Sequence, residues 1–340
     1  MQSQIENSQS IIIPPFLKPG DLLRVIAPSG ALREFTNFER GVEIWRSRGY
    51  KVEISPQIDD RWGYLAGKDN KRRKELASAW QDPECRGILC ARGGFGSTRI
   101  LENWNWGQED KGTGGQGDRG TGGQENNEEF ASLSSPTPPF PHSPPSPKWL
   151  IGFSDITALL WSLEKVGISS VHAPVLTTLS SEPDWSVQRL FDWVEGRPIA
   201  PLKGSGWGGG VKSGILLPAN LTVATHLLST PFQPNLDNVI LAFEDVTEAP
   251  YRIDRMLTQW RMSGALSKVS GIALGSFTKC EAPADVPSLS IEEVLRDRLS
   301  DLGIPIVSNL PFGHEAPNAA LPVGVMATLD AEHGILSVED

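Results

Sequence analysis

The chain has few cysteines and no long apolar run, and each shortage excludes a class of protein. Its 340 residues include three cysteines, Cys85, Cys90 and Cys280, which fit neither a disulfide framework nor a pair of metal ligands. The longest apolar runs are far shorter than the about 20 residues of a membrane-spanning helix. The start MQSQIENSQS lacks the basic region and apolar core of a signal peptide. We therefore expect a soluble, cytoplasmic protein.

Clustered basic residues are scarce as well. Lysine and arginine number 31 against 41 aspartate and glutamate residues, which gives a formal net charge of −10. The longest basic cluster is Lys71-Arg72-Arg73-Lys74. The electrostatic field of a protein with this negative net charge does not attract nucleic acid or an anionic membrane surface, so we expect neither partner. An anionic substrate would have to be held by a few local Arg or Lys side chains.

Short apolar runs alternate with amphipathic stretches in the first half of the chain. Apolar runs predict strands at 22–27, 51–54, 87–91 and 149–153, and helical patterns follow at about 31–47, 68–80 and 155–165. This alternation indicates an α/β fold with a parallel sheet and covering helices. Binding sites in such folds lie at the carboxyl ends of the strands.

The second half alternates less regularly and predicts a mixed α/β or β-rich domain. Its elements are strands at 238–243 and 269–277, helices at 251–262 and 291–302, and a hairpin of 323–329 with 335–338. Because the length exceeds what one core usually serves, we predict two domains. The N-terminal domain spans 1–175, a linker spans 176–210, and the C-terminal domain spans 211–340.

Residues 107–147 interrupt the first half with a low-complexity segment. They contain Gly-Thr-Gly-Gly-Gln twice, then an acidic patch, then the proline-rich SPTPPFPHSPPSP. The segment has too little apolar content to offset the conformational entropy that it would lose on folding. We therefore predict a disordered insertion in a surface loop. His142 within it is therefore a poor catalytic candidate.

Ser154 is the sharpest candidate for a nucleophile. The apolar run Trp149-Leu150-Ile151 leads into Gly152-Phe153-Ser154-Asp155, and a helix follows at once. A strand-to-helix turn lifts the hydroxyl above the sheet edge and leaves the Asp155 N–H at a helix N-terminus, where an oxyanion can be held. The second glycine of G-x-S-x-G is missing, and a helix N-cap is the competing interpretation of this serine.

A glycine-rich turn follows the third predicted strand at Arg92-Gly93-Gly94-Phe95-Gly96. Its free backbone N–H groups suit an anion or an oxyanion. Arg99 stands where a dinucleotide-binding motif needs its third glycine, so nucleotide binding is a weak interpretation. A purely structural tight turn remains the alternative.

An acid and a base follow the serine along the chain. Glu244 comes directly after an apolar strand, and His314 lies in a loop, where a neutral imidazole suits a general base. Asp245 and Glu248 are alternatives for the acid, and His172 is the rival for the base. Ser154, Glu244 and His314 thus follow the order nucleophile, acid, base that a triad needs.

Ordered motifs along almost the whole chain resemble the LD-carboxypeptidases (muramoyltetrapeptide carboxypeptidases), with the microcin-immunity serine carboxypeptidases as relatives. The motifs are Lys18-Pro19-Gly20-Asp21, Ala27-Pro28-Ser29-Gly30, Gly63-Tyr64-Leu65-Ala66-Gly67, Ala91-Arg92-Gly93-Gly94-Phe95-Gly96-Ser97, Gly152-Phe153-Ser154-Asp155, Pro218-Ala219-Asn220-Leu221, Glu244-Asp245, Tyr251-Arg252-Ile253-Asp254-Arg255, Gly313-His314 and Leu321-Pro322-Val323-Gly324.

The resemblance implies a flavodoxin-like N-terminal domain, a smaller C-terminal domain and an active site between them. It implies Ser154 as nucleophile, Glu244 as orienting acid and His314 as base. The residues that it implies for the oxyanion and the substrate are Asp155, Gly93, Gly94 and Asn220, with Arg92 as a candidate for the terminal carboxylate. No metal or cofactor is expected, and family members are often homodimers.

The implied reaction removes a C-terminal D-amino acid, typically D-Ala, from a murein tetrapeptide during recycling of the cell wall. Ala219 stands where the family commonly has glycine, and the insertion 107–147 replaces a short link, so substrate preference is less defined than mechanism. One alternative is an immunity-type serine peptidase that cleaves peptidyl-nucleotide conjugates. Another is a non-catalytic flavodoxin-like protein that binds a small molecule.

Overall fold

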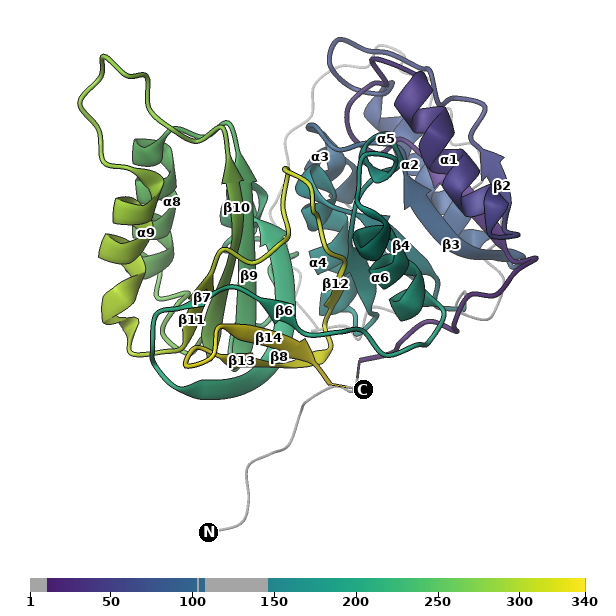
Figure 1. Cartoon of the computed structure of the whole chain (residues 1–340). Coiled ribbons are helices and arrows are strands. Elements are labelled where there is room, and N and C mark those ends of the chain that lie inside the picture. Colours follow the sequence, from purple (N-terminus) through teal and green to yellow (C-terminus); the bar gives the residue numbers. More distant parts are fainter. Residues whose placement is uncertain (1–10, 103, 108–145, 340) are drawn as a thin grey trace, which may run out of the picture.

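The computed structural model describes residues 11–102, 104–107 and 146–339. The predicted insertion therefore lies almost entirely outside the described residues, and so does His142. The described residues form two sheets that stand side by side, with α4 (Thr157–Lys165) between them; β12 (Leu321–Val323) is the edge strand of the first sheet (Figure 1).

The first sheet has the strand order β12-β5-β4-β3-β1-β2. The five strands β1 to β5 are parallel, and their order 2-1-3-4-5 is that of flavodoxin-like folds. The expected α/β fold class is confirmed. The bounds are β1 Leu22–Ile26, β2 Lys51–Ile54, β3 Cys85–Cys90, β4 Trp149–Gly152, β5 Ser170–His172, α1 Thr36–Ser47, α2 Asp69–Gln81, α3 Ser97–Leu101, α5 Leu176–Leu179 and α6 Asp184–Val194.

The second sheet has the order β6-β14-β13-β8-β9-β10-β11-β7, and its strands β8 to β11 are parallel. Helices α8 and α9 lie along its outer side (Figure 1). The bounds are β6 Leu202–Lys203, β7 Ser205–Gly206, β8 Val211–Asn220, α7 Leu221–Leu227, β9 Val239–Val246, α8 Pro250–Met262, β10 Gly271–Thr278, α9 Ile291–Leu299, β11 Ile306–Ser308, β13 Met326–Asp330 and β14 Ile335–Val338.

The chain returns to the first sheet near its end. Strand β12 pairs antiparallel with β5, while the hairpin consists of β13 and β14 in the second sheet. The expected hairpin is present, but assigning Val323 to it is wrong. The apolar run looks continuous in the sequence, yet Gly324 takes φ 85° and separates the two strands. Segment 176–210 carries helices and strands of both halves, and the limits 1–175 and 211–340 stay a prediction.

The two sheets share one hydrophobic core. Helix α4 packs against α7 and β8, and the Trp161 ring meets that of Trp260 edge-on at 6.5 Å between centroids. The Trp161 indole N–H also donates to the Pro218 carbonyl oxygen at 3.0 Å. The carboxyl ends of β4 and β9 are therefore held at a fixed separation.

A close helix contact in the first domain can be tested at Gly41. A Cβ added there would lie 2.1 Å from the Leu176 carbonyl oxygen of α5. Alanine is favoured over glycine in a helix by about 1 kcal/mol, but overpacking typically costs about 1–3 kcal/mol. We expect Gly41→Ala to lower the free energy of unfolding by about 1 kcal/mol or more in urea titrations. The exposed Glu43→Ala on the same helix should change it little, and a more stable G41A protein would contradict the contact.

Candidate active site

Ser154 lies in a strained turn directly after β4. Its φ is 63°, in the left-handed region that non-glycine residues rarely adopt, and such strain costs on the order of 1–3 kcal/mol. The preceding Phe153 is extended and a short 3₁₀ helix begins at Ser154 itself. The Ser154 hydroxyl meets a histidine rather than capping the helix, which is the geometry of an elbow that presents a nucleophile.

His314 lies between Ser154 and Glu244. Its Nε2 is 2.9 Å from Ser154 Oγ, and its Nδ1 is 2.5 Å from Glu244 Oε2. The first sheet supplies the serine, the second supplies the glutamate, and the segment between β11 and β12 supplies the histidine. The structure thus brings the three sequence-predicted residues into one hydrogen-bonded chain.

The alternation of β9 explains why Glu244 points toward His314. Ile240 and Ala242 share its face of the strand and pack in the cluster that contains Phe312 and Leu321. The intervening Leu241 and Phe243 point to the opposite face, toward the helices. Glu244 is fully buried, so its carboxylate needs strong partners.

The backbone before His314 requires a glycine. Gly313 has φ 130°, and a Cβ there would lie 2.2 Å from Ser276 Oγ and 3.2 Å from Glu244 Cβ. The His314 loop can therefore approach the end of β9 only because residue 313 carries no side chain. This close approach shortens the distance from the imidazole to the buried carboxylate.

Asn220 holds the acid from the other side. Its side-chain NH₂ donates to Glu244 Oε1 at 3.3 Å and to Asp245 Oδ1 at 3.0 Å. Its side-chain oxygen accepts the Val223 N–H at 3.1 Å as the N-cap of α7. The sequence placed Asn220 in the substrate-binding stretch, and it does line the pocket, but both ends of its amide are engaged by the protein.

Two histidines near the serine have opposite electrostatic environments. Burial alone lowers the pKa of His314, but the charge of Glu244, the hydrogen bond to it and the charge of Asp245 outweigh burial and raise that pKa. Burial lowers the pKa of His172 to about 4, against the charge of Glu244. His172, the rival base, has no partner for either ring nitrogen among the described residues and is fully buried. It stays neutral and packs against Phe153.

The glycine-rich turn lies against the serine. A Cβ on Gly93 would stand 3.0 Å from Ser154 Cβ and 3.1 Å from its Oγ, so any side chain there would press on the serine. Asp155 N–H belongs to the first turn of the 3₁₀ helix, where N–H groups lack intrahelical acceptors. Gly94 and Asp155 line the pocket beside Ser154, and Gly93 lies against the serine.

The Arg92 guanidinium lies against Gly30 and Gly94. It is half-buried and donates to the Ala31 carbonyl oxygen at 2.7 Å. Burial lowers its pKa, and the charges of Arg33 and Arg61 lower it further. Three guanidinium groups thus gather beside the site, and no carboxylate pairs with any of them among the described residues.

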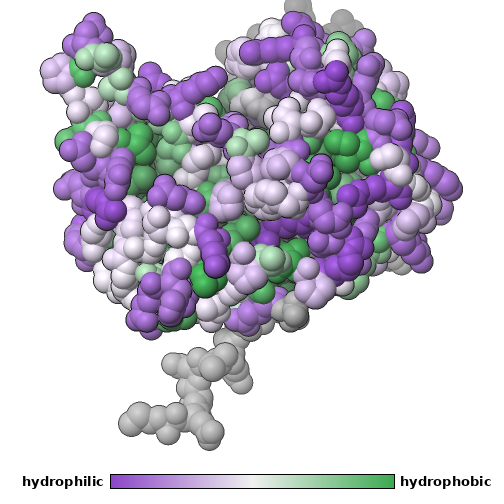
Figure 2. Space-filling view, in the orientation of Figure 1, coloured by the Kyte–Doolittle hydropathy of each residue, from purple (hydrophilic) through white to green (hydrophobic). Residues whose placement is uncertain are grey.

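A pocket of about 650 Å³ opens beside Ser154. Gly94, Phe95 and Asp155 line one wall of it, and α7 with the end of β9 lines the other. The molecule is notched between its two lobes at the top of the space-filling view (Figure 2), the side on which β10 ends in Figure 1. No cluster of His, Cys, Asp and Glu in the described ranges could hold a metal ion, and no helix there is long and apolar enough to cross a membrane.

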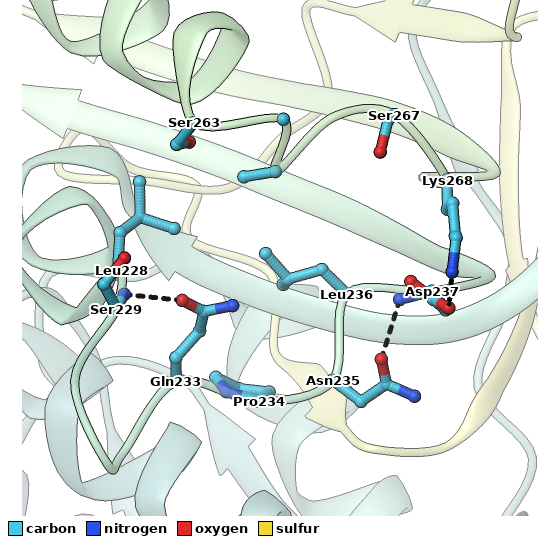
Figure 3. Close-up of a pocket in the computed structure, with 12 residues that line it drawn as sticks. Leu228, Ser229, Gln233, Pro234, Asn235, Leu236, Asp237, Ser263, Ser267 and Lys268 are labelled. Carbon is cyan, nitrogen blue, oxygen red and sulfur yellow. Dashed lines mark hydrogen bonds and ion pairs between the residues drawn. The ribbon is translucent and has the colours of Figure 1, made fainter.

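A second pocket of about 310 Å³ lies between segments 228–237 and 263–268 (Figure 3). None of the sequence-predicted site residues lines it. Its polar groups pair with one another: Ser229 N–H donates to Gln233, Asp237 N–H donates to Asn235, and Lys268 pairs with Asp237. It presents no nucleophile–base pair and is not the candidate active site.

Family models match most of the chain. The LD-carboxypeptidase N-terminal domain matches residues 23–113 and 122–173, and the LD-carboxypeptidase C-terminal domain matches 213–329. A relative in Synechocystis sp., named only as a carboxypeptidase, is 53% identical over 97% of this chain and 98% of its own. The probable murein peptide carboxypeptidase of Bacillus subtilis is 29% identical over 96% and 94%.

Solved structures agree with these matches. The muramoyltetrapeptide carboxypeptidase of Oxalobacter formigenes superposes with a TM-score of 0.74 at 26% identity, covering 94% of this chain and 99% of that one. The microcin C7 self-immunity protein MccF superposes with a TM-score of 0.75 at 19% identity, over 97% and 98%, a likeness that shows the fold alone. The chain belongs to the LD-carboxypeptidase family and is a serine carboxypeptidase.

Proposed function

We propose that this enzyme hydrolyses the L–D peptide bond before a C-terminal D-amino acid, typically D-Ala, in murein tetrapeptides. The chain of hydrogen bonds from Ser154 through His314 to Glu244 is the observation that carries the proposal. The names of the murein-peptide relatives support the substrate class. The proposed role is recycling of cell-wall fragments in the cytoplasm.

The proposed mechanism begins with attack of Ser154 Oγ on the carbonyl carbon of the L residue. His314 Nε2 accepts the hydroxyl proton, and Glu244 holds Nδ1–H and stabilises the imidazolium. The N–H groups of Asp155 and of the Gly93–Gly94 turn stabilise the oxyanion. His314 then gives its proton to the leaving amino group of the D residue. Water, deprotonated by His314, hydrolyses the acyl-enzyme and restores the serine.

An exopeptidase must also hold the free terminal carboxylate. Arg92 is the proposed donor, because its guanidinium lies over Gly30 and Gly94 and keeps N–H groups beyond the one given to Ala31. A guanidinium is suited to a carboxylate because it donates two parallel hydrogen bonds. The likeness to MccF is one of fold and does not favour a peptidyl-nucleotide substrate. The homodimer implied by the resemblance stays a prediction.

Replacing the nucleophile separates a catalytic role from a structural one. Ser154→Ala should fold normally and lose turnover by roughly four to six orders of magnitude, because only binding and the oxyanion donors remain. Labelling by a fluorophosphonate should also disappear. The control is Ser47→Ala, an exposed serine in α1, which should keep both. If S154A retains activity, the proposed triad is wrong.

The activity should fall as the pH decreases through the pKa of His314. The base must be neutral, and that pKa is raised above its ordinary value of 6.5. Because the charge of Asp245 contributes to the increase, Asp245→Asn should move the acid limb of kcat/KM to lower pH. The exposed Asp237→Asn should leave the limb in place. An acid limb below pH 6, or one that D245N moves upward, would contradict this electrostatic assignment.

The substrate class is tested by stereochemistry. Tetrapeptides ending in D-Ala should be cleaved well, and their L-Ala diastereomers poorly. Reversing the terminal centre moves the carboxylate off its donor, and losing a charge-assisted hydrogen bond costs about 1.5–3 kcal/mol, or roughly 10- to 100-fold in kcat/KM. Amidation of the terminal carboxylate should have a similar effect. Equal rates on both diastereomers, measured by amino-acid release, would exclude an LD-carboxypeptidase even if Ser154 is the nucleophile.

A further inference from the structure

The strained conformation of Ser154 must be maintained by its surroundings, because a left-handed serine relaxes when nothing opposes it. The residue next to it carries a buried charged side chain that the proposed mechanism uses only through its backbone. The Asp155 carboxylate is 2% exposed, although charged groups are seldom buried without partners.

The partners of Asp155 come from two neighbouring loops. Its Oδ2 accepts the Ser29 hydroxyl at 2.6 Å and the Ser97 N–H at 2.8 Å, while its carbonyl oxygen accepts the Ser97 hydroxyl. Ser29 follows β1, Ser97 begins α3 after the glycine-rich turn, and both are fully buried. One carboxylate thus joins the loops after β1, β3 and β4, which are adjacent in the sheet.

A second buried charged side chain, that of Arg72, joins two of the same loops. It contacts each loop one residue before the residue that contacts Asp155. Arg72 Nη1 donates to the Pro28 carbonyl oxygen and, at 2.8 Å, to that of Gly96. Pro28 and Gly96 directly precede Ser29 and Ser97, the partners of Asp155. Arg72 and Asp155 are opposite in sign, and their charges attract. We call these two residues the Arg72–Asp155 brace.

We propose that the Asp155 side chain is a positioning residue, which through this brace holds both the nucleophile and the oxyanion donors in place. This inference rests on the proposed role of Ser154. The turn that Asp155 fixes at Ser97 also contains Gly93, which approaches Ser154 so closely that its Cβ would be 3.1 Å from Oγ. A loosened Ser97 link widens this gap and lets the Ser154 backbone relax. Both changes misplace reacting groups without touching the substrate.

The test uses the isosteric Asp155→Asn variant in the full-length enzyme. We expect kcat to fall about 10- to 100-fold with KM and the acid limb of the pH profile unchanged, because the Glu244–His314 pair is intact. The rate of fluorophosphonate labelling should fall by the same factor. Asp82→Asn is the matched control, since Asp82 accepts hydrogen bonds from Arg24 and the Glu84 N–H in the same domain, away from the serine.

The outcomes separate positioning from other roles. A D155N enzyme with a lower melting temperature but unchanged kcat and labelling rate shows a purely structural role and overturns the proposal. A higher KM at constant kcat shows a substrate contact and overturns it as well. If D155N fails to fold, Ser29→Ala with Ser97→Ala decides. It removes the two hydroxyl donors, one to the Asp155 carboxylate and one to the Asp155 carbonyl oxygen, and keeps the carboxylate with its bond from the Ser97 N–H. Lost turnover supports the brace, and full turnover refutes it. A wild-type enzyme inert toward every tetrapeptide contradicts the proposed function, while the labelling ratio still tests the brace.

Discussion

The hydrogen bond between His314 and the buried Glu244 carboxylate is the interaction on which the arrangement of the site depends. It joins a residue of the second sheet to a segment that then returns to pair with the first sheet as β12. Ser154 follows a strand of the first sheet, so the chain of hydrogen bonds is complete only when the two sheets are correctly placed against each other. A buried carboxylate is costly without donors, so Glu244 favours the one arrangement in which His314 and Asn220 both reach it.

The groups around the Glu244–His314 pair determine whether its imidazole takes up a proton. Asp245 points to the opposite face of β9 and is held by Thr222 and Asn220, and burial followed by the charge of Glu244 raises its pKa to about 6. Its negative charge still favours the imidazolium that forms during the reaction. On the other side the site meets His172, which burial keeps neutral. The electrostatic environment therefore favours a proton on His314 over one on His172.

The sequence predicted most of the parallel sheet, and its three candidates Ser154, Glu244 and His314 meet in one chain of hydrogen bonds. Apolar runs such as Trp149–Gly152 are buried strands whose ends locate polar residues at one edge of a sheet. Strand β8 was missed because Val211–Asn220 mixes Lys, Ser, Gly and Pro, and its first three residues are exposed. The return of β12 to the first sheet was missed because its pairing partner, β5, is far away in the sequence. The contacts that Arg72 and the Asp155 side chain make with the loops after β1 and β3 were also invisible, since those partners are 24 to 126 residues away.

Helix α4 sets the distance between Ser154 and Glu244. This helix begins three residues after Ser154, and Thr157 in its first turn accepts the backbone N–H of Asn220 at 3.0 Å. One turn later Trp161 donates to the Pro218 carbonyl oxygen in the same strand. Asn220 in turn contacts Glu244, so two hydrogen bonds from one helix fix the serine relative to its acid. Both bonds lie inside the shared core, where side chains are closely packed. A shift of one sheet against the other would therefore separate Ser154 from His314 and Glu244 before it disrupted either sheet.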